Sequence, residues 1–133
     1  QHQGAYPPAL ETRLAQFSDR IAEVLAGDWD EVLIVGHSSG AYLGVSVLAD
    51  LIRAGRVPAG ATLSFLTLGH VVPMASFLPR ANRLRADLRD LSARPELDWV
   101  DVSAPGDACS FGLCDPVTIS GIEPADRRQP QIQ

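Results

Sequence analysis

A serine bracketed by glycines lies where an apolar stretch gives way to a helical pattern. The sequence there reads Gly36-His37-Ser38-Ser39-Gly40, with the spacing G-x-S-x-G. A serine presented on a very tight strand-to-helix turn takes strained backbone dihedrals, and the residues two places away must be small. The pattern therefore predicts that Ser38 projects from a sharp bend, where its hydroxyl could attack a carbonyl carbon.

The residue after this serine could stabilise the charge that such an attack creates. Ser39 would open a helix, whose first turn has unpaired N–H groups and the positive end of the helix dipole. Its backbone N–H could therefore bind an oxyanion formed at Ser38. The alternative is a structural corner that only joins a strand to a helix, with Ser38 or Ser39 as the N-cap.

Hydrophobic periodicity predicts the elements that position this serine. Apolar residues three and four apart indicate helices, and short apolar runs rich in β-branched residues indicate strands. Helices are predicted at 10–26, 39–53 and 82–93, and strands at 31–36, 62–68 and 97–102. This alternation favours a mostly parallel α/β sheet. Because the first strand is apolar on both faces, we expect it to be central, within a three-layer αβα arrangement.

The remaining segments carry turn-forming residues and are predicted to be irregular. Two prolines argue against a regular element in 69–79, and the tail after Ser103 is rich in Gly, Pro, Cys and Asp. Residues 1–9 and 124–133 are expected to be irregular as well. With 133 residues, 46% of them hydrophobic, the chain is expected to form one domain.

Composition and charge argue against several classes of function. The net charge is −5 and no basic stripe is present, so nucleic-acid binding is not expected. The apolar stretches are too short to cross a bilayer. Cys109 and Cys114 do not cluster in sequence with His2, His37 or His70, so no metal and no other cofactor is expected. The two cysteines are predicted to be free thiols, with a local disulfide as the alternative.

The segment VLIVGHSSGAYLGVSVLADLI, residues 32–52, resembles the nucleophile elbow of the α/β-hydrolase superfamily. The resemblance covers about residues 10–107, and the spacing to the later strands resembles that of esterases and lipases of this fold. It implies a partial α/β-hydrolase fold and a serine hydrolase that acts on a small carboxylic ester or related acyl substrate through an acyl-enzyme on Ser38. An acyltransferase or thioesterase would use the same nucleophile, and a non-catalytic binding module could keep the bend.

The resemblance also implies an acidic residue after a later strand, followed by a histidine. Asp107 lies in a Pro-Gly turn just past the strand at 97–102, where the family's acid would be carried over. Asp115 is an alternative, and Asp101 lies inside the strand, where it is less free to reach the edge. Asp107 could also serve as a turn former, and the two roles are compatible.

A histidine that could act as the base is harder to find. His37 adjoins Ser38 and points from the bend in another direction, and His2 lies in the irregular start. His70 follows a predicted strand and would share a sheet edge with Ser38, so it is a minor candidate against the alternative of a loop histidine. No histidine follows Asp107. We therefore expect the chain to be a piece of a longer protein that supplies the base and a second oxyanion donor.

Apolar residues after the second predicted strand could contact the substrate. Met74, Phe77 and Leu78 lie just past the strand end, near the expected position of Ser38, together with His70. They could line an acyl pocket or cover it. The alternative is a hydrophobic loop packed on the core or on missing parts of the sheet, and His37 could likewise shape the pocket or pack behind it.

Overall fold

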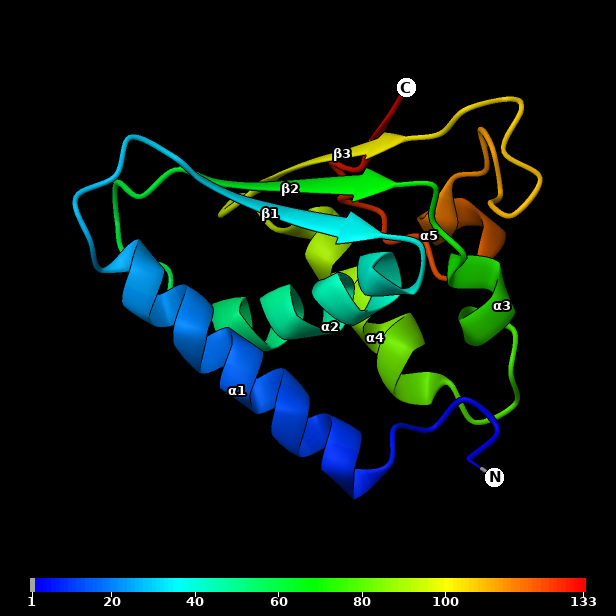
Figure 1. Ribbon diagram of the computed structural model, residues 1–133, viewed down its shortest axis with the longest axis horizontal. Coiled ribbons are helices and arrows are strands. Elements are labelled where there is room, and N and C mark those ends of the chain that lie inside the picture. The colour runs from blue at the N-terminus through cyan, green and yellow to red at the C-terminus, as the bar shows by residue number, and fades with distance from the viewer. Residues whose placement is uncertain (1) are drawn as a thin grey trace.

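A four-stranded parallel sheet organises residues 2–133, the part of the chain that the computed structural model describes (Figure 1). The strands lie in chain order, and each is parallel to its neighbour. They are β1 (Val32–His37), β2 (Leu63–Leu68), β3 (Asp98–Val102) and β4 (Gln131–Ile132). The α/β class predicted from the alternation of elements is confirmed.

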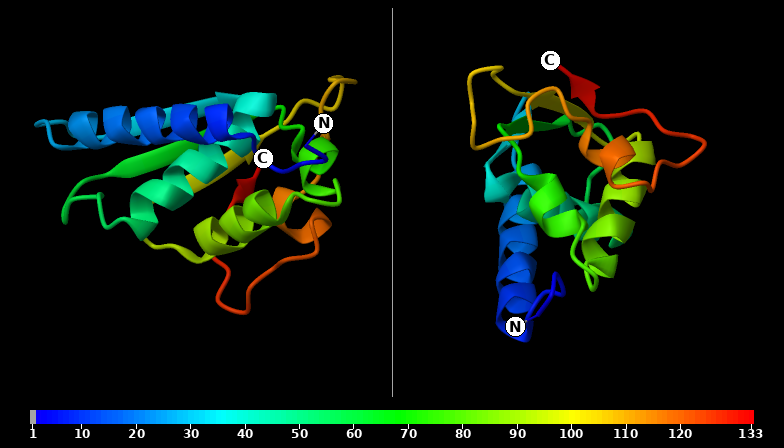
Figure 2. Two further views of the ribbon diagram at one scale, coloured as in Figure 1. Left: turned by 90° about the horizontal axis from the view of Figure 1, so that it is seen from below. Right: turned by 90° about the vertical axis from the view of Figure 1, so that its right-hand side faces the viewer.

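Five helices precede or connect these strands. They are α1 (Pro8–Leu25), α2 (Ser39–Arg53), α3 (Val72–Ser76), α4 (Asn82–Ala93) and α5 (Pro116–Ile119). Because the strand order follows the chain order, successive crossovers run in the same direction and place their helices on the same side of the sheet. The views in Figure 2 show the helices gathered on that one side.

The hydrophobic core lies between the sheet and the helices α2 and α4. Alternate residues of β2, Leu63 and Phe65, face these helices and are buried, as a strand with one covered face requires. Phe65 packs against Trp99 of β3 with ring centroids 5.5 Å apart. A β-carbon on Gly44 of α2 would stand 2.8 Å from the Phe65 ring, so glycine allows α2 to approach the sheet closely.

The opposite face of the sheet carries no helix among residues 2–133. Leu33 and Val35 of β1 point to this face and are 53% and 52% exposed. β1 is also an edge strand, because β2 is its one partner among the described strands. The expectation of a central strand with helices on both sides is therefore not met, and the described residues build two layers. The apolar residues on both faces of β1 indicate that burying both faces would be favourable. They carry no signal for which element would pack on each face.

Three short elements occur where irregular structure was predicted. The prolines of α3 and α5 lie in the first turn of each helix, where a missing N–H removes no intrahelical bond. β4 lies within the predicted irregular tail and pairs with Val100 and Asp101 of β3. The prediction of irregular structure over residues 1–9 is wrong from Pro8 onward, because α1 begins there. Gln1 lies outside the described residues. The six predicted helices and strands otherwise agree to within two residues at each end.

Candidate functional site

Ser38 lies at the bend between β1 and α2 and has a strained backbone. Its φ is 55° and its ψ is −118°, a combination that residues other than glycine rarely adopt. Such a conformation costs on the order of 1–3 kcal/mol and persists where neighbouring contacts enforce it. The Ser38 N–H donates to the carbonyl of Leu68 at 3.1 Å, and its carbonyl accepts the N–H of Ala41 at 3.2 Å. The predicted sharp turn is present and is held from both sides.

The Ser38 side chain makes no capping hydrogen bond, although the residue occupies the N-cap position of α2. A serine that served as a cap would direct its oxygen to an N–H of the first helical turn. The half-buried hydroxyl is therefore not used by the helix. The next residue, Ser39, is exposed, and its N–H lies in the turn that lacks intrahelical acceptors.

The two glycines of the motif differ in their surroundings. A β-carbon on Gly36 would lie 2.7 Å from the carbonyl oxygen of Gly40 and 2.9 Å from the α-carbon of Ala41. Real β-carbons essentially never approach so closely, so Gly36 supplies the room that the bend needs. A β-carbon on Gly40 would meet none of the described atoms within 4 Å. The expectation that Gly40 also relieves crowding is therefore wrong for this part of the chain.

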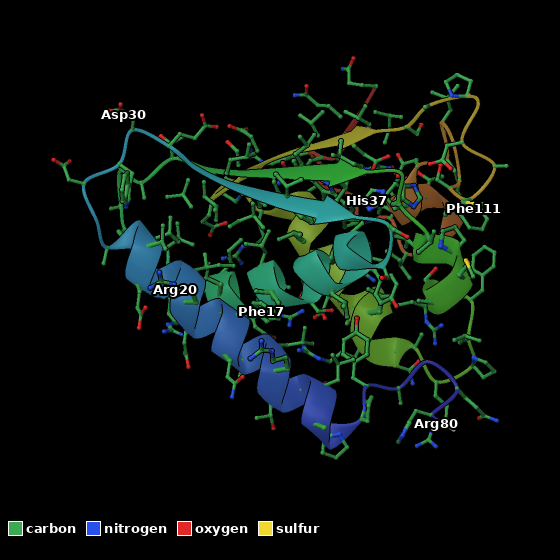
Figure 3. All side chains as sticks on the ribbon, in the orientation of Figure 1. Phe17, Arg20, Asp30, His37, Arg80 and Phe111 are labelled. Carbon is green, nitrogen blue, oxygen red and sulfur yellow. The ribbon has the colours of Figure 1, made fainter. Side chains whose placement is uncertain are left out.

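Asp107 places its carboxylate at the same edge of the sheet. Figure 3 shows this edge, with His37 at the end of β1 and Phe111 in the loop beyond β3. The Oδ2 atom of Asp107 is 3.0 Å from the β-carbon position of Gly69, the residue that follows β2. Ser38 binds the preceding carbonyl, that of Leu68. The serine and the carboxylate therefore approach the end of β2 from the strands on its two sides.

The carboxylate of Asp107 also has a local structural role. Its Oδ1 accepts the backbone N–H of Cys109 at 3.0 Å, and its own N–H donates to the carbonyl of Ala104 at 3.0 Å. The first bond is typical of an Asx turn, and the second closes a backbone turn over residues 104–107. The turn-former interpretation is therefore confirmed, and it leaves Oδ2 without a bond to the turn.

The other two candidate acids are committed to structural contacts. Asp115 caps α5 by accepting the N–H groups of Val117 and Thr118, and it forms an ion pair with Arg127. Asp101 is fully buried, and its Oδ1 accepts the Thr67 hydroxyl at 2.5 Å. Burial raises the pKa of the Asp101 carboxyl because the charged form loses its hydration. Asp107 remains the carboxylate best placed at the sheet edge.

His70 is not a catalytic base or a pocket-lining residue. It is 1% exposed, so a substrate in solvent does not reach it, and neither of its ring nitrogens is hydrogen-bonded to Ser38. Both ring nitrogens have partners, because Nδ1 accepts the Val72 N–H at 3.2 Å and Nε2 lies 2.7 Å from the carbonyl oxygen of Cys114. The two sequence-based hypotheses for His70 are therefore wrong. A short apolar strand followed by Gly-His carries no signal that would have predicted this burial.

The other two histidines do not replace it as a partner of the serine. His37 is exposed at the end of β1 and makes no side-chain hydrogen bond with any residue of 2–133 (Figure 3). His2 is exposed in the N-terminal segment. The described residues thus place the serine, the first turn of α2 and a carboxylate at one edge of the sheet, without a histidine hydrogen-bonded to Ser38 or Asp107.

Exposed apolar side chains occur on two adjacent segments near this edge. Met74 of α3 and Phe77, the residue that follows α3, are 65% and 61% exposed, so they do not pack on the core. Phe111 and Leu113, which sequence reasoning missed, are exposed in the loop after β3. The two segments adjoin, because the Phe111 N–H donates to the carbonyl of His70 at 3.2 Å. Packing of Met74 and Phe77 on the core of the described residues is therefore wrong, and packing on further parts of the sheet stays a prediction.

The structure also bears on the predictions for the two cysteines, for metal binding and for membrane-spanning helices. Cys109 and Cys114 are free thiols, as predicted. Across residues 2–133, no three His, Cys, Asp or Glu side chains are grouped so that they could hold a metal ion. No described helix has both the length and the apolar character needed to span a bilayer.

No protein-family model, curated protein or solved structure matches the chain. The fold and the site define its class: an α/β protein with a strained serine at a strand-to-helix bend and a carboxylate at the same edge of a parallel sheet.

Proposed function

We propose that the chain carries the nucleophile and the acid of a serine hydrolase of the α/β-hydrolase type, which acts on a carboxylic ester or related acyl substrate. The observation that carries the proposal is the backbone of Ser38, with φ 55° and ψ −118°, combined with a side chain that does not cap α2. Strain of this kind is retained where the surrounding structure requires it, and it clusters at active sites.

The reaction would begin with attack of the Ser38 Oγ on the substrate carbonyl. The new O–C bond moves the carbonyl electron pair onto oxygen, and the backbone N–H of the exposed residue Ser39 can donate to that oxyanion. Collapse of this intermediate breaks the bond to the alcohol, which leaves with a proton, and forms an acyl-enzyme. Attack by water on the acyl carbon then releases the carboxylic acid and restores Ser38.

Proton transfer in this scheme requires a histidine that Asp107 orients: it would take the Ser38 hydroxyl proton and give it to the departing alcohol, then take a proton from the attacking water and return it to Ser38. His70 is buried with both nitrogens engaged, and His37 and His2 bond to neither Ser38 nor Asp107. The proposal therefore requires a base from polypeptide beyond these 133 residues. Free imidazole can replace it in an experiment, provided that it can enter the space between the serine and the carboxylate.

The substrate class follows from the side chains near this edge. Met74 on α3, Phe77 just after it and Phe111 in the adjoining loop are exposed and apolar. They favour an acyl group with an apolar chain over a charged one, because apolar contact with these side chains removes area from water. No cofactor enters the scheme.

A fluorophosphonate probe tests the proposal on the 133-residue chain. We expect slow phosphonylation of Ser38, detected by intact mass and peptide mapping, that accelerates with added imidazole. Ser38→Ala should abolish the mass increase, whereas Ser39→Ala, which keeps the backbone N–H, should retain it. Absence of labelling at Ser38 with and without imidazole, in a folded chain, would overturn the proposal.

A binding module without turnover is the second candidate, and it is favoured because no histidine in the described part of the chain is bonded to Ser38 or Asp107. In that case the bend would be a shape retained without chemistry. The same experiment separates the two, because a module offers no reason for imidazole to accelerate the modification of one serine.

A further inference from the structure

The proposed chemistry does not use His70, yet this residue is among the most buried polar groups of the chain. A buried imidazole is costly unless each nitrogen has a hydrogen-bond partner. Such a residue requires a structural explanation, and its partners provide one. They belong to two segments: the start of α3 and the loop at residues 103–115, which carries Asp107.

The hydrogen bonds of His70 determine its tautomer. The Val72 N–H donates to Nδ1, so that nitrogen has a free lone pair and no proton. The proton is therefore on Nε2, which donates to the carbonyl of Cys114 at 2.7 Å. A neutral ring, with one nitrogen as acceptor and the other as donor, satisfies both contacts. The imidazole therefore does not have to carry a charge in its buried position.

The 103–115 loop meets the end of β2 at three points. The His70 ring donates to the carbonyl of Cys114, and the His70 carbonyl accepts the Phe111 N–H. The third point is Gly69, whose β-carbon position lies 3.0 Å from Oδ2 of Asp107. Gly69 and His70, the two residues that follow β2, therefore determine how the loop lies on the sheet edge. Because the loop carries Asp107, they also determine the position of its carboxylate.

Asp101 supports this arrangement from behind the ring. Its Oδ2 lies 3.7 Å from Nε2 of His70, and this buried oxygen has no hydrogen-bond partner among residues 2–133. Its Oδ1 is held by the Thr67 hydroxyl, which in turn accepts the indole N–H of Trp99 at 3.0 Å. A fixed acceptor on the Nε2 side favours the tautomer that carries its proton there.

We propose that His70 is a positioning residue that, as the neutral Nε2–H tautomer, clamps the 103–115 loop and thereby fixes the Asp107 carboxylate at the sheet edge beside Ser38. The clamp stands on hydrogen bonds alone. Its effect on Ser38 rests on the proposed function.

Nuclear magnetic resonance of the 133-residue chain tests the clamp without any catalysis. A two-bond ¹H–¹⁵N spectrum should show His70 with a protonated Nε2 and an unprotonated Nδ1. We expect His70→Leu to accelerate exchange of the Phe111 and Cys109 amide hydrogens by about tenfold or more, the change that loss of a buried hydrogen bond produces. The opposite tautomer, or unchanged exchange at both amides, would overturn the proposal.

Two further variants separate positioning from general loss of stability. His70→Gln can donate an amide N–H from about the position of Nε2, so it should restore much of the protection. Leu88→Ala removes a fully buried side chain of α4 and should destabilise the whole molecule without acting on the loop. If Leu88→Ala releases the Phe111 and Cys109 amides as selectively as His70→Leu does, the clamp is refuted.

The imidazole-dependent labelling of Ser38 tests the functional consequence. We expect His70→Leu and Asp107→Asn each to slow labelling by about tenfold, and the double variant to be no slower than either, because both act through one carboxylate. His70→Gln should recover most of the rate. If Ser38 is labelled and His70→Leu has no effect on the rate, the positioning proposal fails. If Ser38 is never labelled but the loop amides respond as described, the clamp stands and the proposed function fails.

Discussion

The carboxylate of Asp107 lies directly against Gly69: its Oδ2 atom is 3.0 Å from the β-carbon position of that glycine, whose φ is +52°. Glycine is required there for two independent reasons, a left-handed backbone and a close neighbour. The end of β2 is thereby shaped to accept a side chain from the loop after β3. The strand that contributes the carbonyl bound by Ser38 also seats the candidate acid.

Replacing Gly69 should displace this carboxylate. An alanine in the left-handed conformation costs roughly 1–2 kcal/mol. We expect Gly69→Ala to lower the free energy of unfolding by more than this amount. It should also accelerate hydrogen exchange of the Cys109 amide. Gly55→Ala is the matched control, because Gly55 also has a positive φ, +65°, and its β-carbon would meet nothing within 4 Å. Equal losses in both variants, measured by urea unfolding, would show that the contact with Asp107 does not matter.

The two glycines of the Ser38 bend should respond in opposite ways. Gly36→Ala places a methyl group 2.7 Å from the carbonyl oxygen of Gly40, and we expect a loss of about 1–3 kcal/mol from overpacking. Gly40→Ala introduces a methyl group into open space on a helix, so stability should be unchanged or rise by up to about 1 kcal/mol. Urea unfolding of the two variants measures both changes. A similar loss in both would contradict the asymmetry.

The sequence predicted the bend at Ser38 and six of the nine elements because long periodic segments and the G-x-S-x-G spacing are local signals. It failed where structure depends on distant contacts. β4 has two residues and forms because it can pair with the edge of β3. The helices α3 and α5 are short and depend on packing against the rest of the fold. The burial of His70 depends on Cys114, 44 residues away, and no local pattern encodes such a pairing.

The faces of β1 provide a test of the two-layer arrangement. Ile34 packs against the core cluster, whereas Val35 points to the face without helices and is half-exposed. We expect Ile34→Thr to lower the free energy of unfolding by about 1–3 kcal/mol, because it places a hydroxyl against the core. Val35→Thr should change stability by less than about 0.5 kcal/mol. A loss at Val35 as large as that at Ile34 would indicate that this face is covered in solution.

Tyr6 should give the chain a pH-dependent stability in alkaline solution. Its hydroxyl lies 2.9 Å from Oγ of Ser46, and burial raises its pKa from 10.0 to about 12. In the unfolded chain the phenol loses its proton near pH 10, so between pH 10 and 12 the folded state binds more protons and stability falls as the pH rises. We expect this fall to reach up to about 3 kcal/mol and to disappear in Tyr6→Phe. Phenolate absorbance should show a step near pH 12 that Tyr42→Phe retains and Tyr6→Phe removes, and a step near pH 10 for Tyr6 would refute its burial.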